Sequence, residues 1–150
     1  DIRRFVQRGK PIYAECGGLM YLARSICWDN QQADMVGALP LDITMQQRPQ
    51  GRGYVKLSET NRFPWPKLAG RHDHQIRAHE FHYSRAETID PEVDFAYLVQ
   101  RGSGIDGKHD GVLFANVLAS YAHQRHTLAN PWTSRFVQHI KASSKTALAI

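Results

Sequence analysis

Short apolar runs alternate with amphipathic stretches along this 150-residue chain. Apolar runs of about four to eight residues bounded by glycine, proline or polar residues are typical of strands, and apolar residues three and four apart predict helices. We expect a helix end at residues 2–8, helices at 17–26 and 131–142, strands at 11–16, 54–57, 75–83, 95–100 and 112–121, an interrupted strand at 35–43, and loops at 29–34 and 61–71. This order favours an α/β domain.

The length is that of one domain with a core of its own. We assign residues 1–142 to this domain and expect residues 143–150 to be a frayed tail. Residues 2–8 resemble the end of a helix whose beginning is missing, with Gly9 closing it. The chain is therefore expected to be an N-terminally incomplete piece of a longer protein.

The formal charge of +5 comes from 19 Lys and Arg against 14 Asp and Glu. These residues are scattered, and no aromatic RNA-binding signature accompanies them, which argues against a nucleic-acid partner. A solvated surface or attraction for a polycarboxylate explains the charge equally well. No apolar run approaches the roughly 18 residues of a membrane span, and the first residues lack a secretion signal. We expect a cytoplasmic protein without a membrane partner, whose two cysteines, Cys16 and Cys27, are reduced.

Cys16 lies where the apolar run Pro11–Ala14 meets the amphipathic run that begins at Leu19. Gly17 and Gly18 follow it, so the backbone can turn sharply and a substrate can approach the sulfur, as in a nucleophile elbow. A thiol at a helix N-terminus faces unpaired N–H groups that lower its pKa. The alternative is that Cys16 is a small buried hydrophobe, the commonest role of a lone cysteine in an apolar strand.

A thiolate nucleophile needs a base within hydrogen-bond reach. Of the eight histidines, His123 directly follows an apolar strand, as Cys16 does, and ligands of open α/β sheets bind at the carboxyl ends of strands. The histidines and Glu80 could instead hold zinc, but ligand spacing such as His-Glu-x-x-His is absent. We therefore expect no metal.

Three segments together resemble the C-terminal glutaminase domain of cobyrinic acid a,c-diamide synthases, a branch of the class I (triad) glutamine amidotransferases. They are residues 13–22 (YAECGGLMYL), 79–84 (HEFHYS) and 116–123 (NVLASYAH). The resemblance implies an open, mostly parallel, flavodoxin-like sheet flanked by helices. It also implies that Cys16 attacks glutamine with His123 as base, and that the released ammonia amidates tetrapyrrole carboxylates in a separate synthetase domain, which uses ATP and Mg²⁺. The oligomeric state, a homodimer included, is left open.

The same resemblance implies that Gly17, Gly18, Glu80, Phe81, His82 and Tyr83 bind the substrate glutamine. Typical triad glutaminases carry a Glu two residues after the catalytic His, and this branch usually has a second His there. Here the position is Arg125, which cannot accept the imidazole N–H. Either another acceptor orients His123, or glutamine hydrolysis is slow.

Two further readings stay open from the sequence. One is an amidase of the same family that acts on sirohaem or sirohydrochlorin, which the unusual Arg125–His126 pair suggests. The other is a catalytically impaired, glutaminase-like interaction module, since a fold does not determine a function.

Overall fold

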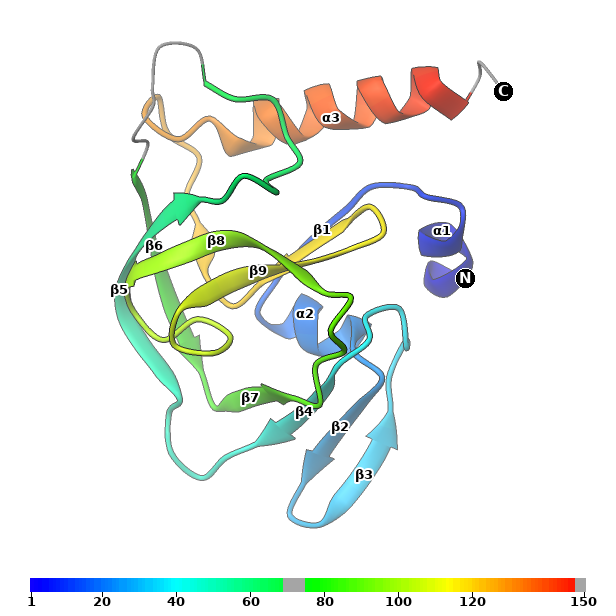
Figure 1. Cartoon of the computed structure of the whole chain (residues 1–150). Coiled ribbons are helices and arrows are strands. Elements are labelled where there is room, and N and C mark those ends of the chain that lie inside the picture. Colours follow the sequence, from blue (N-terminus) through cyan, green and yellow to red (C-terminus); the bar gives the residue numbers. More distant parts are fainter. Residues whose placement is uncertain (69–74, 148–150) are drawn as a thin grey trace.

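The computed structural model describes residues 1–68 and 75–147, in which a large sheet, a small sheet and three helices are found (Figure 1). The elements in chain order are α1 (Ile2–Gln7), β1 (Ile12–Glu15), α2 (Gly17–Leu22), β2 (Ser25–Trp28), β3 (Gln31–Asp34), β4 (Asp42–Met45), β5 (Gly51–Glu59), β6 (Gln75–His82), β7 (Ser84–Glu87), β8 (Asp94–Arg101), β9 (His109–Phe114), β10 (Val117–Ser120), β11 (His123–Gln124) and α3 (Trp132–Ala147). The expected α/β class is confirmed.

The large sheet has the strand order β1-β10-β9-β8-β5-β6-β11, and the small sheet β3-β2-β4-β7. Among the described strands of the large sheet, only β1 and β10 pair in parallel. The sheet is thus largely antiparallel here, in contrast to the mostly parallel sheet expected. Parallel neighbours need long crossovers, usually helical, whereas short connections join β8 to β9 and β9 to β10.

Several element boundaries differ from those expected. The helix at 17–26 ends at Leu22, because Ser25 already pairs in β2, and the polar loop at 29–34 contains the exposed strand β3. The run 112–121 divides at Ala115, whose positive φ of +50° turns the chain from β9 into β10. The helix end at 2–8 is confirmed by α1, with Gly9 at a φ of +67°.

Helix α3 continues through Ala147, past the start of the expected frayed tail. The Ser143 hydroxyl donates to the His139 carbonyl oxygen and the Ser144 hydroxyl to that of Ile140, so both side chains bond within the helix. Residues 148–150 lie outside the described residues. No described helix is long and apolar enough to cross a membrane.

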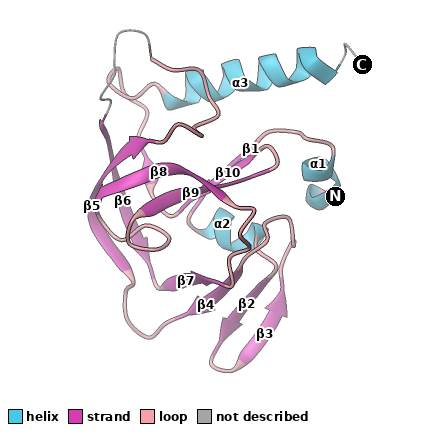
Figure 2. Cartoon of the chain, in the orientation of Figure 1, coloured by secondary structure: helices cyan, strands magenta, loops and turns pink. Residues whose placement is uncertain are grey.

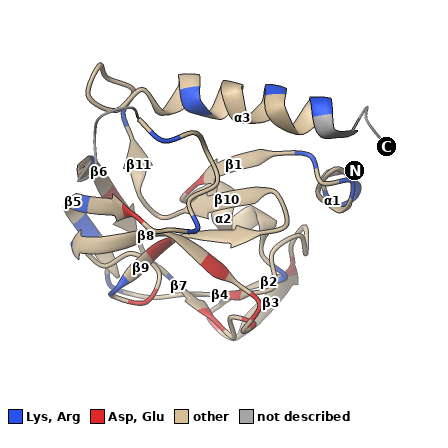
Figure 3. Ribbon diagram, turned by 45° about the horizontal axis from the view of Figure 1, so that its top comes forward, with Lys and Arg blue, Asp and Glu red and all other residues tan. Residues whose placement is uncertain are grey.

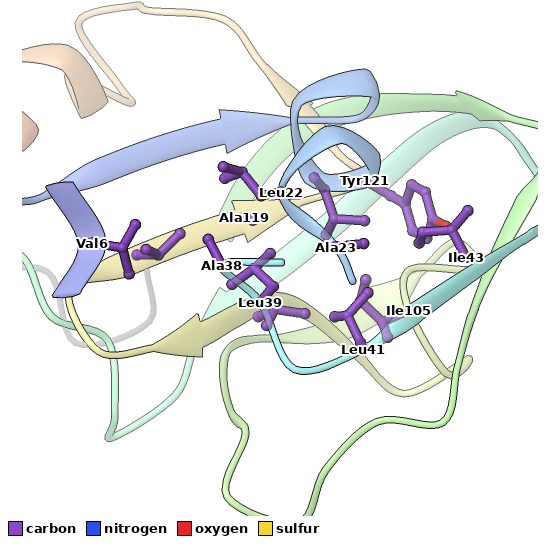
Figure 4. Packing of buried hydrophobic residues seen from close by; sticks show 13 residues of the cluster. Val6, Leu22, Ala23, Ala38, Leu39, Leu41, Ile43, Ile105, Ala119 and Tyr121 are labelled. Carbon is purple, nitrogen blue, oxygen red and sulfur yellow. The ribbon is translucent and has the colours of Figure 1, made fainter. Parts of the chain in front are cut away.

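Two apolar clusters lie against the large sheet. In the first, Leu19, Leu22 and Ala23 in and after α2 pack with Leu39 to Ile43 and with Ala119 of β10 (Figure 4). In the second, Trp65 of the 61–68 loop and residues of α3 pack over β5, β6 and β8, where the helix crosses the top of the sheet (Figure 2). The two clusters hold β1 and β10 between layers, which fixes the ends of these strands.

The carboxyl ends of β1 and β10 lie side by side, as expected. Glu15 pairs with Ser120, and the Cys16 N–H donates to the Ser120 carbonyl oxygen at 2.8 Å. After β10 the chain turns into β11, where His123 pairs with His79 of β6. The turn therefore brings His123 to the edge of the sheet at which Cys16 lies.

Candidate active site

Cys16 lies in a strained turn between β1 and α2. Its φ of +46° and ψ of −102° are rare for a residue with a side chain. The turn is held by the Cys16 N–H bond to Ser120 and by the Met20 N–H, which donates to the Cys16 carbonyl oxygen at 3.1 Å. A Cβ on Gly18 would lie 3.1 Å from Ala14 Cβ, whereas one on Gly17 would meet nothing within 4 Å. Gly18 thus packs closely against Ala14 of β1, whereas the space around Gly17 is open.

The thiol of Cys16 is half-buried and donates to the Phe81 carbonyl oxygen, with 3.8 Å between sulfur and oxygen. Burial raises the pKa of this thiol above its ordinary value. The Gly17 N–H opposes that shift, but the carboxylates of Glu15 and Asp110 add to it. The first N–H of α2 therefore lowers the pKa as expected, but the net shift is upward, against the expected stabilisation of the thiolate. With only six residues, α2 offers a weak dipole, which burial and two carboxylates outweigh.

This raised pKa predicts how Cys16 reacts with iodoacetamide. Only the thiolate is alkylated, so the rate should rise about tenfold per pH unit and should not level off below the ordinary thiol value of about 8.5. The measurement is the alkylation rate of the Cys27→Ser variant, which keeps Cys16 alone, between pH 6 and pH 10. The Cys16→Ser variant supplies the background. A rate that is already constant above neutral pH would contradict the raised pKa.

His123 is half-buried at the start of β11, and its ring stacks on that of His79 with centroids 4.9 Å apart. Its Nδ1 lies 3.4 Å from Oε2 of Glu15, the residue directly before Cys16. An N–H on Nδ1 directed at this carboxylate leaves Nε2 with a free lone pair. His123 thus has the acidic partner that Arg125 cannot provide.

Glu15 is itself held in place by two donors. Its Oε1 accepts from the Tyr13 hydroxyl at 2.6 Å and from the Gln124 N–H at 2.9 Å. Burial raises the pKa of Tyr13, so this phenol stays a donor. The Gln124 side chain then bonds Tyr13 and Tyr97 and accepts from Asn130. The backbone after His123 is therefore tied to the carboxylate that faces its ring.

Asp110, which the sequence analysis did not single out, holds the turn that leads to His123. It is fully buried and accepts from the N–H groups of Tyr121 and Ala122, both at 3.0 Å, and from the Ser120 hydroxyl at 2.9 Å. Burial raises the pKa of this carboxyl against these hydrogen bonds. In the sequence, Asp110 lies between His109 and Gly111, before the apolar run that begins at Val112, so nothing in the local pattern marks it as buried.

The four residues Glu80 to Tyr83 lie on two sides of the chain. Glu80 and His82 are buried, and the Glu80 carboxylate accepts from the N–H groups of Ser103 at 2.7 Å and Gly104 at 3.0 Å. Burial opposes ionisation of Glu80, but the His82 ring, whose Nε2 lies 3.6 Å from Oε2, and these N–H groups outweigh it and lower its pKa. His82 stacks on Tyr121 with centroids 3.7 Å apart.

Phe81 and Tyr83, in contrast, are 51% and 39% exposed and pack edge to face. Phe81 is also the residue whose carbonyl oxygen meets the thiol. The structure thus brings Phe81 to Cys16 and directs the side chains of Glu80 and His82 to the interior, behind the strand.

The remaining candidates lie apart from Cys16. His126 is exposed, and its Nδ1 lies 2.5 Å from the Thr133 hydroxyl of α3. His109 pairs with Asp106, and His139 with Asn116; His72 and His74 lie outside the described residues. Within residues 1–68 and 75–147 no group of His, Cys, Asp and Glu could hold a metal ion. Cys16 and Cys27 are both free thiols, as expected.

Comparison with known proteins agrees with this geometry. Residues 1–131 match the model of the CobB/CobQ-like glutamine amidotransferase domain. The cobyrinate a,c-diamide synthase of Magnetococcus marinus is 50% identical over 122 residues, which are 81% of this chain and 25% of the relative. That of Archaeoglobus fulgidus is 42% identical over 138 residues, or 92% of this chain and 29% of the relative.

The chain thus spans between a quarter and a third of the length of these relatives. Among solved structures, a crystal structure of a glutamine amidotransferase superimposes with a TM-score of 0.61 at 17% identity, covering 93% of this chain and 66% of the other. This likeness confirms the fold of that class. The match over residues 1–131 shows that the chain belongs to the CobB/CobQ-like glutamine amidotransferase domain family.

Proposed function

We propose that this chain is the glutamine-hydrolysing part of a cobyrinate a,c-diamide synthase-like amidase, with Cys16 as nucleophile and His123 as base. The observation that carries the proposal is the strained turn at Cys16, which directly follows Glu15, the residue whose carboxylate lies 3.4 Å from His123 Nδ1. Strain at a residue is kept where function requires it, and a nucleophile, a base and an acidic partner are the groups that amide hydrolysis by a thiol needs.

In the first half of the reaction, His123 Nε2 takes the proton of the Cys16 thiol, and the sulfur attacks the side-chain amide carbon of glutamine. The amide C–N bond breaks as His123 returns that proton to the leaving nitrogen, so ammonia departs and a γ-glutamyl thioester remains. In the second half, His123 removes a proton from water, whose oxygen attacks the thioester. Glutamate leaves, and the thiol is restored.

The raised pKa of Cys16 fits this order of events. A thiol that stays protonated when no base takes its proton does not react with stray electrophiles, and His123 supplies the base when glutamine is bound. Gly17 and Gly18 would let glutamine approach the sulfur, and Phe81 and Tyr83 would line its path. Glu80 and His82 would support that path from behind through the loop at Ser103 and Gly104.

We further propose that the ammonia is used outside this chain, on carboxylates of a tetrapyrrole in a synthetase part that binds ATP and Mg²⁺. The described residues of this chain do not fit a metal site. The relatives at 42–50% identity are named cobyrinate a,c-diamide synthases, which supports a cobyrinate-type acceptor over sirohaem or sirohydrochlorin. The cytoplasmic location stays a prediction.

The glutamine analogue diazo-oxo-norleucine tests the proposal, because it alkylates a thiol only after binding as glutamine does. We expect Cys16 to be labelled and Cys27 to be spared, with glutamine protecting Cys16, as mass spectrometry of the digested protein would show. Cys27→Ser should be labelled like the wild type, and Cys16→Ser should not be labelled. Labelling of Cys27 alone, or of neither residue, would rule out Cys16 as the nucleophile.

A further inference from the structure

Strand β11 carries His123 but is too short to hold it in place by strand pairing alone. It consists of His123 and Gln124, which pair with His79 and Ala78 of β6. Among the described strands of the large sheet, β11 lies at the edge and has β6 as its one neighbour. The chain then runs from β11 into the loop that leads to α3 (Figure 3). Contacts besides the strand pairing are therefore needed to fix the backbone at His123.

The side chain of Gln124 supplies these contacts. It is buried, and its Nε2 donates to the hydroxyl of Tyr97 in β8 at 2.7 Å and to that of Tyr13 in β1 at 3.1 Å. Its Oε1 accepts from Nδ2 of Asn130 at 3.0 Å. Both N–H groups of the amide and its oxygen are thus bonded. A buried polar group whose partners are all in place is held in a single orientation.

The partners of Gln124 belong to the core. Tyr97 is fully buried, and burial raises the pKa of both Tyr97 and Tyr13, so each phenol keeps its proton. The Tyr13 ring packs on the rings of Trp132 and Phe136 in α3, with centroids 4.8 Å and 6.0 Å away. The amide of Gln124 is therefore anchored to elements that the sheet and α3 hold in place.

Gln124 also contacts the acidic partner of the base. Its main-chain N–H donates to Glu15 Oε1 at 2.9 Å, and Oε2 of the same carboxylate lies 3.4 Å from His123 Nδ1. Because His123 directly precedes Gln124, one anchored residue sets the position of the imidazole and of a donor to its carboxylate partner. A shift of β11 would move both groups relative to Cys16.

We propose that Gln124 is a positioning residue for glutamine hydrolysis, whose buried side chain aligns His123 with Glu15. The inference rests on the proposed function, because it requires His123 to be the base. A misplacement of about 1 Å, caused by a change away from the reacting atoms, can lower a rate by about 10²-fold.

Gln124→Met tests this role, because methionine is close to glutamine in length but has no amide. We expect kcat for glutamate release to fall by about 10²-fold while KM for glutamine changes little, since alignment of the base acts on the chemical steps. Gln100→Met is the matched control. Gln100 is an exposed residue of β8 whose amide donates to the Ser58 hydroxyl, so its kcat should equal that of the wild type. All rates are measured well below the Tm of each variant.

A merely structural role of Gln124 predicts a different pattern. Gln124→Met leaves buried polar groups unpaired and should lower Tm in either case, so kcat is compared in a double-mutant cycle with Glu15→Gln. If Gln124 acts by aligning His123 with Glu15, kcat of the double variant should lie within about tenfold of that of Glu15→Gln alone. Independent losses that multiply to about 10⁴-fold would overturn the proposal.

Asn130→Ala provides a second, milder variant in case Gln124→Met does not fold. It removes the donor to Gln124 Oε1 and keeps both tyrosine contacts, so kcat should fall by about fivefold at an unchanged KM, as for one lost hydrogen bond. Full activity of His123→Ala would refute the proposed function and this inference with it. An inactive His123→Ala together with wild-type kcat in Gln124→Met, or in Asn130→Ala if only that variant folds, would overturn the role of Gln124 alone.

Discussion

Replacing His123 by Ala is expected to lower glutamine hydrolysis by about 10³-fold, because a positioned general base contributes about 10²–10⁴-fold. The effect should be large here because the Cys16 thiol has a raised pKa, which lowers its thiolate fraction near neutral pH when no base takes its proton. Glutamate release by the purified protein measures the loss. Since the rate without a base follows the thiolate fraction, the residual rate of His123→Ala should increase with pH.

His126→Ala is the matched control for this experiment. His126 lies three residues further along and contacts Thr133 of α3, so its removal should leave glutamate release near the wild-type rate. In the whole amidase, His123→Ala should also keep its activity with added ammonia, which bypasses glutamine hydrolysis. A dead His126→Ala and an active His123→Ala would show that the base is assigned to the wrong residue.

The turn at Cys16 and the place of His123 could be expected from the sequence because both follow from local pattern. An apolar strand, a cysteine and two glycines predict the turn, and a histidine after an apolar strand lies at a strand end. Which side chains of Glu80 to Tyr83 face the site could not be predicted in the same way. Consecutive residues of a strand point to opposite faces, so a motif that is continuous in sequence is divided by β6 between interior and surface.

The partner of His123 could not be found in this way. Glu15 and His123 lie 108 positions apart in sequence and meet only because β1 pairs with β10, whose following turn forms β11. The spacing of triad glutaminases places the acceptor at position 125, whereas the fold supplies one from the residue before the nucleophile. Strand β3 was missed for another reason. All four of its residues are exposed, so no alternation marks them.

Replacing Glu15 by Gln tests whether this residue is the acidic partner of His123. The amide keeps the size of the side chain and can still accept from Tyr13 and the Gln124 N–H, but it carries no negative charge towards Nδ1. We expect kcat for glutamine hydrolysis to fall by about 10²-fold or more, as when the buried acid of other catalytic triads is neutralised. KM for glutamine should change little, since the Glu15 carboxylate faces His123, Tyr13 and the Gln124 N–H.

A purely structural role of Glu15 predicts something else. Weaker hydrogen bonds to Tyr13 and Gln124 would lower Tm. Tyr13→Phe, which removes the 2.6 Å hydrogen bond but keeps the carboxylate, would then lose as much activity as Glu15→Gln. A positioning role predicts that kcat of Tyr13→Phe stays within about tenfold of the wild-type value and that Glu15→Asp recovers part of the rate. It also predicts that only Glu15→Gln changes the pH profile of kcat. The last difference is decisive because the charge of Glu15 stabilises the imidazolium that forms when His123 takes the Cys16 proton. An unchanged pH profile in Glu15→Gln would therefore show that Glu15 only anchors β11 and that His123 acts without an acidic partner.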